Sequence, residues 1–354
     1  MLKINKTLLC LIALIACFTS SAQDFARHNW YFTGNDQAIV FGKDNEANPI
    51  IDEGKSAQLN IGEKVTVTNP TTGDLIFYTD GSTIFDATNL RMADGDNILS
   101  DPAGIQALST SPVPGVLGQG QYYLFHRNAS GEILYTLVDS NTPGILPSGF
   151  VNPSQKNQST GITNRGDGMI TIGSMDMTTF WLITQDLTDS TLQIHEVPAI
   201  GGTFNQVGTI NLTNPILVEH MAYHQETGQI ALIPSNNANI EVLQFTEGGM
   251  VGPSLNGVRT ILNSFVFGED FGGSAGWSFS GQFLYFSRNT GTEGNLYRFD
   301  MLDMRPEASV ETVLSSPIEE SLSLQLAPDS TLYHIYRDAP AGDRLLGRIN
   351  FADS

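Results

Sequence analysis

The chain has 354 residues and a formal net charge of −20; it contains 35 Gly, 16 Pro, 19 Phe and 10 Tyr, and only 15% of its residues are charged. Abundant turn formers and aromatic residues favour short strands joined by many loops. So acidic a surface argues against nucleic acid and anionic lipid as partners, because phosphate contacts need clustered Lys and Arg. We interpret the acidity as a source of solubility in preference to a Ca²⁺-binding surface.

Residues 1–22 have the pattern of a secretory signal peptide. Lys3 and Lys6 precede an apolar run at 8–16, and small residues follow at 19–22. The run is roughly half of the ~20 residues that a membrane-spanning helix needs, so we expect no membrane span. Cleavage after Ala22 would leave an exported chain with a net charge of about −22, since the two lysines are removed.

An alternative cleavage would produce a lipoprotein. Residues 14–17 (LIAC) resemble a lipobox that would leave a lipidated Cys17, although the bulky Phe18 directly after the cysteine argues against it. The other cysteine, Cys10, also lies in the signal region. Cleavage after Ala22 therefore leaves no disulfide, and stability must come from a large buried core.

The remaining sequence carries a recurring apolar strand core. The cores are NWYF at Trp30, LIFYT at Leu75, YYLF at Tyr122, FWLIT at Phe180, IALIP at Ile230, FLYFS at Phe283 and LYHIY at Leu332. They are 45, 47, 58, 50, 53 and 49 residues apart, and a period near 50 is typical of a propeller blade. We expect an all-β fold, a β-propeller of about seven blades, or six if NWYF only completes the last blade.

Several cores are followed by a second strand after a turn. Segments 120–139, 228–246 and 280–300 each place turn-forming residues between two apolar runs, which is the signature of a hairpin. We interpret each hairpin as the two middle strands of a blade. Helical periodicity is almost absent, which argues against an α/β fold, and a β-sandwich array would not need a common period.

The chain is expected to form one domain over residues 23–354. Strands near 30–41 should pair with strands near 332–350 and close the ring, because closure removes the exposed sheet edges that promote aggregation.

A set of segments in this order also carries a family resemblance: Trp30-Tyr31-Phe32, 73–86 (GDLIFYTDGSTIFD), 92–95 (MADG) with Leu99, 111–115 (SPVPG), 134–139 (LYTLVD) and 323–333 (SLQLAPDSTLY). Together they resemble the N-terminal, WD40-like propeller region of secreted Bacteroidetes-type proteins of the type IX secretion pathway. Longer members of that family end in a gliding-motility-associated sorting domain. The resemblance implies a secreted or cell-surface propeller.

The sequence departs from that family at two places. Ser330 stands where a turn glycine is usual, and no sorting domain follows before Ser354. We therefore expect either the N-terminal part of a longer precursor or a short relative. Residues 23–354 alone are not expected to reach the cell surface by type IX secretion, and a periplasmic protein or a lipoprotein anchored through Cys17 are the alternatives.

The strongest resemblance to an enzyme motif is Gly272-Gly273-Ser274-Ala275-Gly276, which matches the G-x-S-x-G nucleophile elbow and is followed by Asp300 and His334 in hydrolase order. The elbow needs a helix after the serine to supply aligned amide donors. Residues 277–279 lead instead into the strand core at Phe283. We therefore expect Ser274 not to be a nucleophile.

Glu219, His220 and His224 suggest a metal site. Histidines four apart share a helical face, but on a strand they lie about 13 Å apart, too far to share a zinc ion. We interpret residues 221–224 (MAYH) as an inner strand that precedes a turn at 225–228.

Other acidic groups have plainer interpretations. Residues 94–97 (DGDN) could offer oxygen ligands to Ca²⁺ but lack the EF-hand register, so a turn is favoured. The pairs Glu269-Asp270 and Glu319-Glu320 could form a glycosidase site in a central funnel, although solvated loop charges are commoner. The sequons at Asn128, Asn157 and Asn211 carry little information in a bacterial chain, and the aromatic side chains of Trp181 and Trp277 are expected in the core rather than on a sugar.

The sequence thus predicts a secreted or cell-surface binding module, with a glycan or protein as partner. We assign no catalytic, cofactor-binding or metal-binding residue. We expect the protein to be a monomer and not to be an enzyme. One alternative is an extracellular polysaccharide hydrolase or lyase, which a cluster of funnel carboxylates with raised pKa values would favour. The other is a structural spacer domain, which a funnel without convergent polar groups would favour.

Overall fold

The computed structural model describes residues 29–31, 37–40, 50–53, 65–69, 72–116, 120–141, 148–212, 216–235, 239–248, 252–261, 273–289, 293–303, 310–327, 329–338, 344–350 and 353. The predicted signal peptide, both cysteines, and Glu269 and Asp270 lie outside these residues. Within them, no helix is both long and apolar enough to cross a membrane.

The described strands form six hydrogen-bonded sheets. The first two sheets contain β1 (Asn29–Tyr31), β2 (Gln37–Val40) and β3 (Ile50–Glu53), and then β4 (Val65–Thr68), β5 (Leu75–Thr79) and β6 (Ile84–Asp86). The third contains β7 (Leu108–Pro112), β8 (Gln121–Arg127), β9 (Ile133–Asp139), β10 (Phe150–Val151) and β11 (Gln158–Ser159), with the 3₁₀ turn η2 (Pro153–Gln155) between the last two.

The other three sheets follow in chain order. They contain β12 (Arg165–Gly173), β13 (Phe180–Asp186), β14 (Thr191–Glu196) and β15 (Asn205–Asn211); β16 (Val218–His224), β17 (Gln229–Pro234), β18 (Ile240–Thr246) and β19 (Ser254–Ile261); and β20 (Ala275–Trp277), β21 (Phe283–Asn289), β22 (Gly294–Asp300), β23 (Val310–Leu326), β24 (Leu332–Asp338) and β25 (Arg344–Ile349). All the strand pairings within these sheets are antiparallel.

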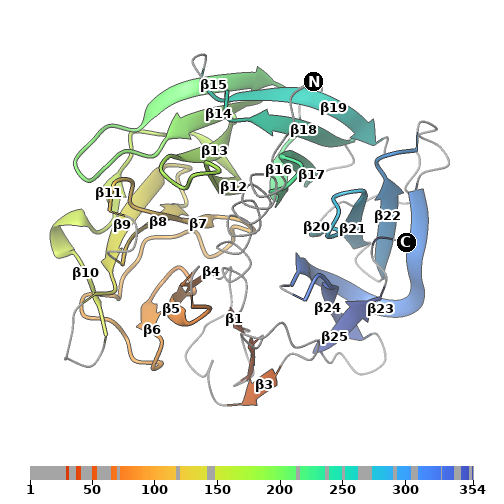
Figure 1. The fold of residues 1–354 in the computed structure, drawn as a ribbon, viewed down its shortest axis with the longest axis horizontal. Helices are drawn as coiled ribbons and strands as arrows, with labels where there is room; N and C mark the ends of the chain where they lie inside the picture. Colours follow the sequence, from red (N-terminus) through yellow and green to blue (C-terminus); the bar gives the residue numbers. More distant parts are fainter. Residues whose placement is uncertain are drawn as a thin grey trace, which may run out of the picture.

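The sheets succeed one another around a central axis in chain order, which is the arrangement of a β-propeller (Figure 1). The first strands of successive sheets are neighbours: β1 lies beside β4, β4 beside β7, β7 beside β12, β12 beside β16 and β16 beside β20. We call these the inner strands. The expectation of an all-β propeller is confirmed.

The second strands β13, β17 and β21 are buried on both faces, because sheets pack against them from both sides. In β17, every residue from Ile230 to Pro234 is buried, whereas β15, at the outer edge of its sheet, is largely exposed. A continuous apolar run is the pattern of a strand that is covered on both faces. This explains why the recurring apolar cores are so visible in the sequence.

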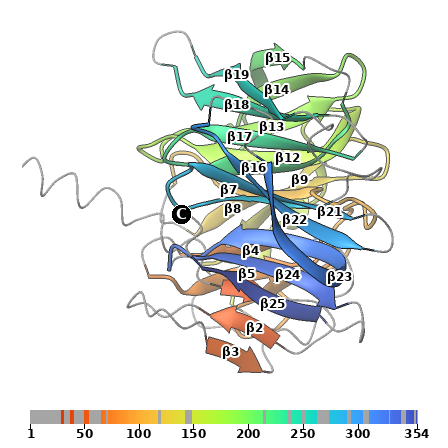
Figure 2. The ribbon, with the colours of Figure 1, turned by 90° about the vertical axis from the view of Figure 1, so that its right-hand side faces the viewer.

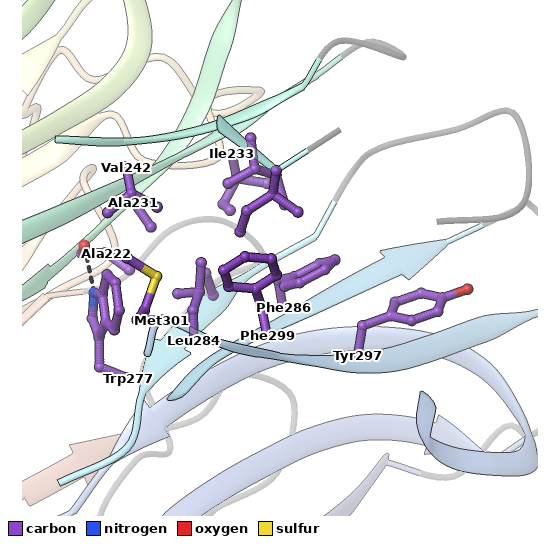
Figure 3. Packing of buried hydrophobic residues seen from close by; sticks show 13 residues of the cluster. Ala222, Ala231, Ile233, Val242, Trp277, Leu284, Phe286, Tyr297, Phe299 and Met301 are labelled. Atoms are coloured by element: carbon purple, nitrogen blue, oxygen red, sulfur yellow. Dashed lines mark hydrogen bonds between the residues drawn. The ribbon is translucent and has the colours of Figure 1, made fainter. Parts of the chain in front are cut away.

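One apolar cluster fills the space between each pair of well-described neighbouring sheets. Between the β16–β19 sheet and the β20–β22 strands, Phe286 and Phe299 pack against Ile233 and Val242 (Figure 3). Trp277 is buried there and its indole N–H donates to the carbonyl oxygen of Ala222, 3.0 Å away. Burying an aromatic side chain of this kind contributes about 1.5–3 kcal/mol.

Asp and Asn side chains close many of the turns. Asp80 Oδ1 accepts hydrogen bonds from the backbone N–H and the hydroxyl of Ser82, and Asp176 Oδ1 does the same with Thr178. Asn128, the first residue of a predicted sequon, accepts the same pair of bonds from Ser130. These are Asx turns, in which the side-chain oxygen of Asp or Asn accepts a hydrogen bond from the backbone N–H two residues further along. The recurring Asp/Asn-x-Ser/Thr pattern is thus explained by turn formation.

Strand β23 is unusually long at 17 residues and joins two groups of strands. Its first half pairs with β22, and from Ile318 onward it pairs with β24 (Figure 2). Its second half also lies beside β20, in the position of an inner strand.

Most of the predicted strand cores are central strands in the structure. Five of the seven cores lie on the second strand of a sheet, at β5, β8, β13, β17 and β21, and the core at Leu332 lies on β24, the fifth strand of the six-stranded sheet. NWYF is different, because Trp30 lies on β1, the first strand of its sheet. The three hairpins form as β8–β9, β17–β18 and β21–β22.

The predicted closure by pairing of the two chain ends is not what the structure shows. Among the described strands, β1 pairs with β2 and β25 pairs with β24, so the terminal strands belong to separate sheets. The physical reason is that strands adjacent in sequence pair first, through short antiparallel connections.

Candidate functional site

Two neighbouring inner strands each carry a carboxylate at an irregularity of the ladder. The register of β12 against β13 shifts between Arg165 and Met169, around Asp167, and the register of β16 against β17 shifts between Val218 and His220, at Glu219. A β-bulge turns a side chain away from the regular alternation and is frequent beside functional sites. Because β12 and β16 lie side by side, the two bulges bring two acidic residues near one another.

The glycines on either side of Asp167 are required by close packing. A Cβ atom on Gly168 would lie 2.7 Å from Cγ1 of Val218, and one on Gly166 would lie 3.0 Å from Oε1 of Gln185. The sequence Gly166-Asp167-Gly168 therefore allows β12 to approach β16 and the end of β13 closely, with the aspartate as the only side chain in the bulge.

Arg127, at the end of β8, links two of the acidic groups. Its Nη2 donates to Asp101 Oδ2 over 2.8 Å and also to Asp167 Oδ1. The Arg127 side chain is only 12% exposed, whereas that of Asp167 is 30% exposed, so the guanidinium is shielded from water and the Asp167 carboxylate partly so. A shielded guanidinium with two carboxylates is held in one orientation and in turn fixes the position of Asp167.

Glu219 has an environment that favours its protonated form. Burial, and secondarily the negative charge of Asp167, raise the pKa of the Glu219 carboxyl from 4.5 to about 7. Its Oε2 atom is buried and has no hydrogen-bond partner within the described part of the chain. The next residue, His220, is affected in the opposite sense, because burial lowers the pKa of its imidazole to about 4.

Gln106 connects the segment before β7 to β16. Its Nε2 donates to the carbonyl oxygen of Met221 over 3.0 Å, and its Oε1 accepts from the Met221 N–H over 2.7 Å. This two-point bond holds the backbone next to Glu219 and His220. We call Asp101, Gln106, Arg127, Asp167, Glu219 and His220 the inner-strand site.

The inner-strand site combines three chemical capacities. Asp167 offers an acceptor held by a cation, Glu219 can donate a proton near neutral pH, and His220 offers a neutral imidazole. A carboxyl group with a raised pKa beside a second carboxyl group that is paired with a cation can serve both to bind hydroxyl groups and in acid–base chemistry.

The histidines of the metal hypothesis are accounted for otherwise. Residues 221–224 lie on the inner strand β16, as predicted. His224 Nε2 donates to the carbonyl oxygen of Phe279 over 3.0 Å, and its Nδ1 lies 2.9 Å from Thr227 Oγ1. Within the described residues, no group of three or more His, Cys, Asp or Glu side chains is arranged to hold a metal ion.

The geometry around Ser274 differs from that of a nucleophile elbow. The serine is followed by strand β20 and a turn into β21, without a helix. His334 Nε2 lies 2.7 Å from Ser321 Oγ, so this histidine is paired with a different serine. Both Ser321 and His334 are about 2% exposed, which makes their pair part of the packed interior.

The other acidic candidates are engaged in local contacts. Lys156 Nζ donates to the carbonyl oxygen of Asp94 over 3.0 Å, and Arg91 pairs with Asp96 at 3.1 Å, so cations occupy the turn at 94–97. Glu319 and Glu320 both pair with Arg337.

The two tryptophans considered for sugar stacking are core residues, as expected. Trp181 packs against Phe245 with ring centroids 5.3 Å apart, and Trp277 is 3% exposed.

Sequence reasoning singled out Glu219 and His220 but missed Asp101, Gln106, Arg127 and Asp167. The signal that could have identified one of them is Gly166-Asp167-Gly168, because an aspartate between two glycines in a strand indicates a bulge with a functional side chain. The other three come from separate loops and strand ends that only the fold brings together.

No protein-family model and no curated protein matches the sequence. Among solved structures, the chain is similar to the periplasmic gluconolactonase PpgL of Pseudomonas aeruginosa, with 13% identity over 92% of this chain and 94% of that chain and a TM-score of 0.50. It is also similar to the β-propeller domain of Cps50 (Swd1) from Myceliophteria thermophila, with 9% identity, 91% and 96% coverage and a TM-score of 0.50. At these identities the likeness shows the fold, a β-propeller, and no more.

Proposed function

We propose that the protein is a binding module that holds a glycan at the inner-strand site. The propeller fold does not select this function, because the two similar structures are a gluconolactonase and a Swd1 domain. What supports it is the site: two bulged inner strands place Asp167 and Glu219 together, and Glu219 Oε2 is buried without a partner among the described residues. A buried polar atom of this kind calls for a hydrogen-bond partner, which a ligand hydroxyl can supply.

The convergence of donors and acceptors also argues against a purely structural spacer. Arg127 and Gln106 hold the backbone and carboxylate groups in place by shielded bonds. What a spacer has no need of is the buried, unpartnered oxygen of Glu219 next to these positioned groups, whereas a binding site can use it.

A glycan array tests this proposal with the exported form, residues 23–354. The wild-type protein should bind at least one glycan, and the double variant Asp167→Asn/Glu219→Gln should lose at least about tenfold in affinity. The matched control is Glu196→Gln, at an exposed carboxylate on β14, which should bind like the wild type. Equal binding by the double variant would contradict the proposal, and capture of a surface protein without any glycan would replace the glycan with a protein partner.

One observation favours a second candidate, a hydrolase or lyase acting on extracellular polysaccharide. The raised pKa of Glu219, about 7, suits a general acid at neutral pH, and Asp167, paired with Arg127, lies near it. Release of reducing ends from neutral polysaccharides should then fall at least about 100-fold in Glu219→Gln. If the wild type turns over none of the glycans that it binds, the enzyme hypothesis is excluded and the binding module is the function that stays.

We further propose that the ring has seven blades. The inner strands β1, β4, β7, β12, β16 and β20 and the second half of β23 provide seven successive neighbours around the axis. On this interpretation β23 is the outer strand of one blade and the inner strand of the next, which makes two blades of the six-stranded sheet. An experimental structure with a different number of inner strands would contradict it.

The place of action that we propose is outside the cytoplasm, secreted or at the cell surface, in line with the resemblance to type IX secretion proteins. The support is the signal-peptide pattern at residues 1–22. N-terminal sequencing of the exported protein should find Gln23 first. A lipidated Cys17 would instead establish the lipoprotein, and an intact Met1 in the cytoplasm would refute export.

A further inference from the structure

A cavity with a mixed polar and apolar lining lies where the start of β23, paired there with β22, comes near the end of β25. Its volume is about 280 Å³, and it opens between strands β21, β22, β23 and β25. We call it the seam pocket; its lining residues are Tyr285, Arg298, Glu311, Thr312, Val313, Ile349 and Asn350.

The polar groups of the seam pocket are held in place before any ligand arrives. The Arg298 guanidinium lies over the ring of Phe283, 4.6 Å from its centroid, and donates to Glu311 Oε2 over 2.6 Å. Tyr285, in the interior, is 1% exposed and is hydrogen-bonded to Arg298. A stacked and paired guanidinium keeps one orientation, so that a ligand would not have to order it.

The rest of the lining is uncharged. Val313 and Ile349 offer apolar surface, and Thr312 and Asn350 offer a hydroxyl and an amide. Arg298 and Glu311 are the two charged residues of this lining, and they neutralise each other. An uncharged ligand can bind beside this partly exposed ion pair without disturbing its balance of charge.

The size restricts the ligand as well. A volume of about 280 Å³ corresponds to roughly nine water molecules, enough for a single ring with its hydroxyl groups but not for a chain. Arg298 donates hydrogen bonds, Glu311 accepts them and the Asn350 amide does both, which suits the hydroxyl groups of a sugar ring. The aliphatic surface beside them suits the C–H face of the ring.

We propose that the seam pocket binds a single neutral monosaccharide unit, with Arg298, Glu311 and Asn350 on its hydroxyl groups and Val313 and Ile349 against its C–H face. This site is separate from the inner-strand site and adds a second, outer contact for a glycan. The proposal does not depend on the inner-strand site.

The test uses the methyl glycosides of glucose, galactose, mannose and N-acetylglucosamine as probes, with residues 23–354 and ligand-observed NMR. At least one probe should bind the wild type with Kd near or below about 1–10 mM. Val313→Trp should fill the pocket and weaken binding at least about tenfold. The control Ile200→Trp, at an exposed aliphatic residue in the connection between β14 and β15, should leave it unchanged.

Further variants test the role of Glu311 and separate this site from the first. Glu311→Gln keeps the shape of the pocket but removes a charge-assisted acceptor, so it should weaken binding severalfold. Glu196→Gln, at the exposed carboxylate on β14, is its matched control and should leave binding unchanged. Binding that is lost in Glu219→Gln and retained in Val313→Trp would overturn the seam-pocket proposal and leave the inner-strand site intact. No binding of any probe by the wild type would overturn it too.

Discussion

At the scale of single residues, buried histidines make stability depend on pH. Burial lowers the pKa of His126, His195, His220 and His334 from 6.5 to about 4. The unfolded chain therefore binds more protons than the folded chain between these values. The stabilisation is fully present above pH 6.5 and is lost as the pH falls toward 4.

We expect the melting temperature to fall by more than about 5 °C between pH 7 and pH 4.5. Asp176 does not compete in this window, because its hydrogen bonds to Ser174 and Thr178 lower its pKa to about 2. Glu219 acts in the opposite direction. Because its pKa is raised, its contribution to folding stability is present below pH 4.5 and is lost as the pH rises through about 7. A melting temperature that stays constant or rises on acidification would show that the histidines titrate normally.

Gly281 should not tolerate a side chain. Its φ is +71°, and a Cβ atom would lie 2.7 Å from both His224 Nδ1 and Thr227 Cγ2. Gly281→Ala should lower the free energy of unfolding by about 2–4 kcal/mol, from the left-handed backbone and the clash together. Gly201→Ala separates the two causes, because φ is +82° there and nothing lies within 4 Å of the added atom. Gly201→Ala should lower the free energy of unfolding by only about 1–2 kcal/mol. Urea titration measures both variants, and equal losses would rule out the clash.

At the scale of elements, side chains near the ends of β13 and β21 bond to the backbone of strands that are not their ladder partners. Gln185 on β13 donates to the carbonyl oxygen of Ile216 and accepts from the Val218 N–H over 2.8 Å. Asn289 on β21 makes the same pair of bonds with the backbone of Ser321 on β23. Arg127 on β8 occupies the corresponding place but reaches the side chain of Asp167 instead. The inner-strand site thus uses, at the end of β8, a position whose side chain has a structural role on β13 and β21.

Gln185→Leu should lower the free energy of unfolding by about 2–4 kcal/mol, because it leaves two buried backbone groups without a partner. Gln206→Leu, at an exposed position on β15, is the matched control and should change it by less than about 0.5 kcal/mol. Chemical denaturation measures both. A similar midpoint for the two variants would mean that water replaces the bond across the sheets.

The sequence predicted the middle strands because their burial on both faces leaves a continuous apolar run, as in β13 and β17. It predicted MAYH as an inner strand from the turn that follows. The bulges at Asp167 and Glu219 could not be predicted in the same way, since their register depends on pairing with β13 and β17. Nor could their proximity, which depends on the order of sheets around the axis.

At the scale of the whole molecule, part of the negative charge comes from aspartates that form turns. Asp80, Asp176 and Asp189 each accept hydrogen bonds from residues two positions further along, as Asx turns do. A propeller has many such turns, so an acidic surface arises without a cation-binding role. Against that background, Glu219 is distinctive because it lies on an inner strand and favours the protonated form.

The central claim is that Asp167 and Glu219 form a ligand site on the inner strands, and carboxyl-carbon NMR of a ¹³C-glutamate-labelled protein tests it most directly. One resonance should titrate with a pKa near 7, disappear in Glu219→Gln, and shift when the glycan selected by the array is added. If every glutamate titrates near the ordinary value of 4.5 and none responds to the glycan, the inner-strand site is not a binding site.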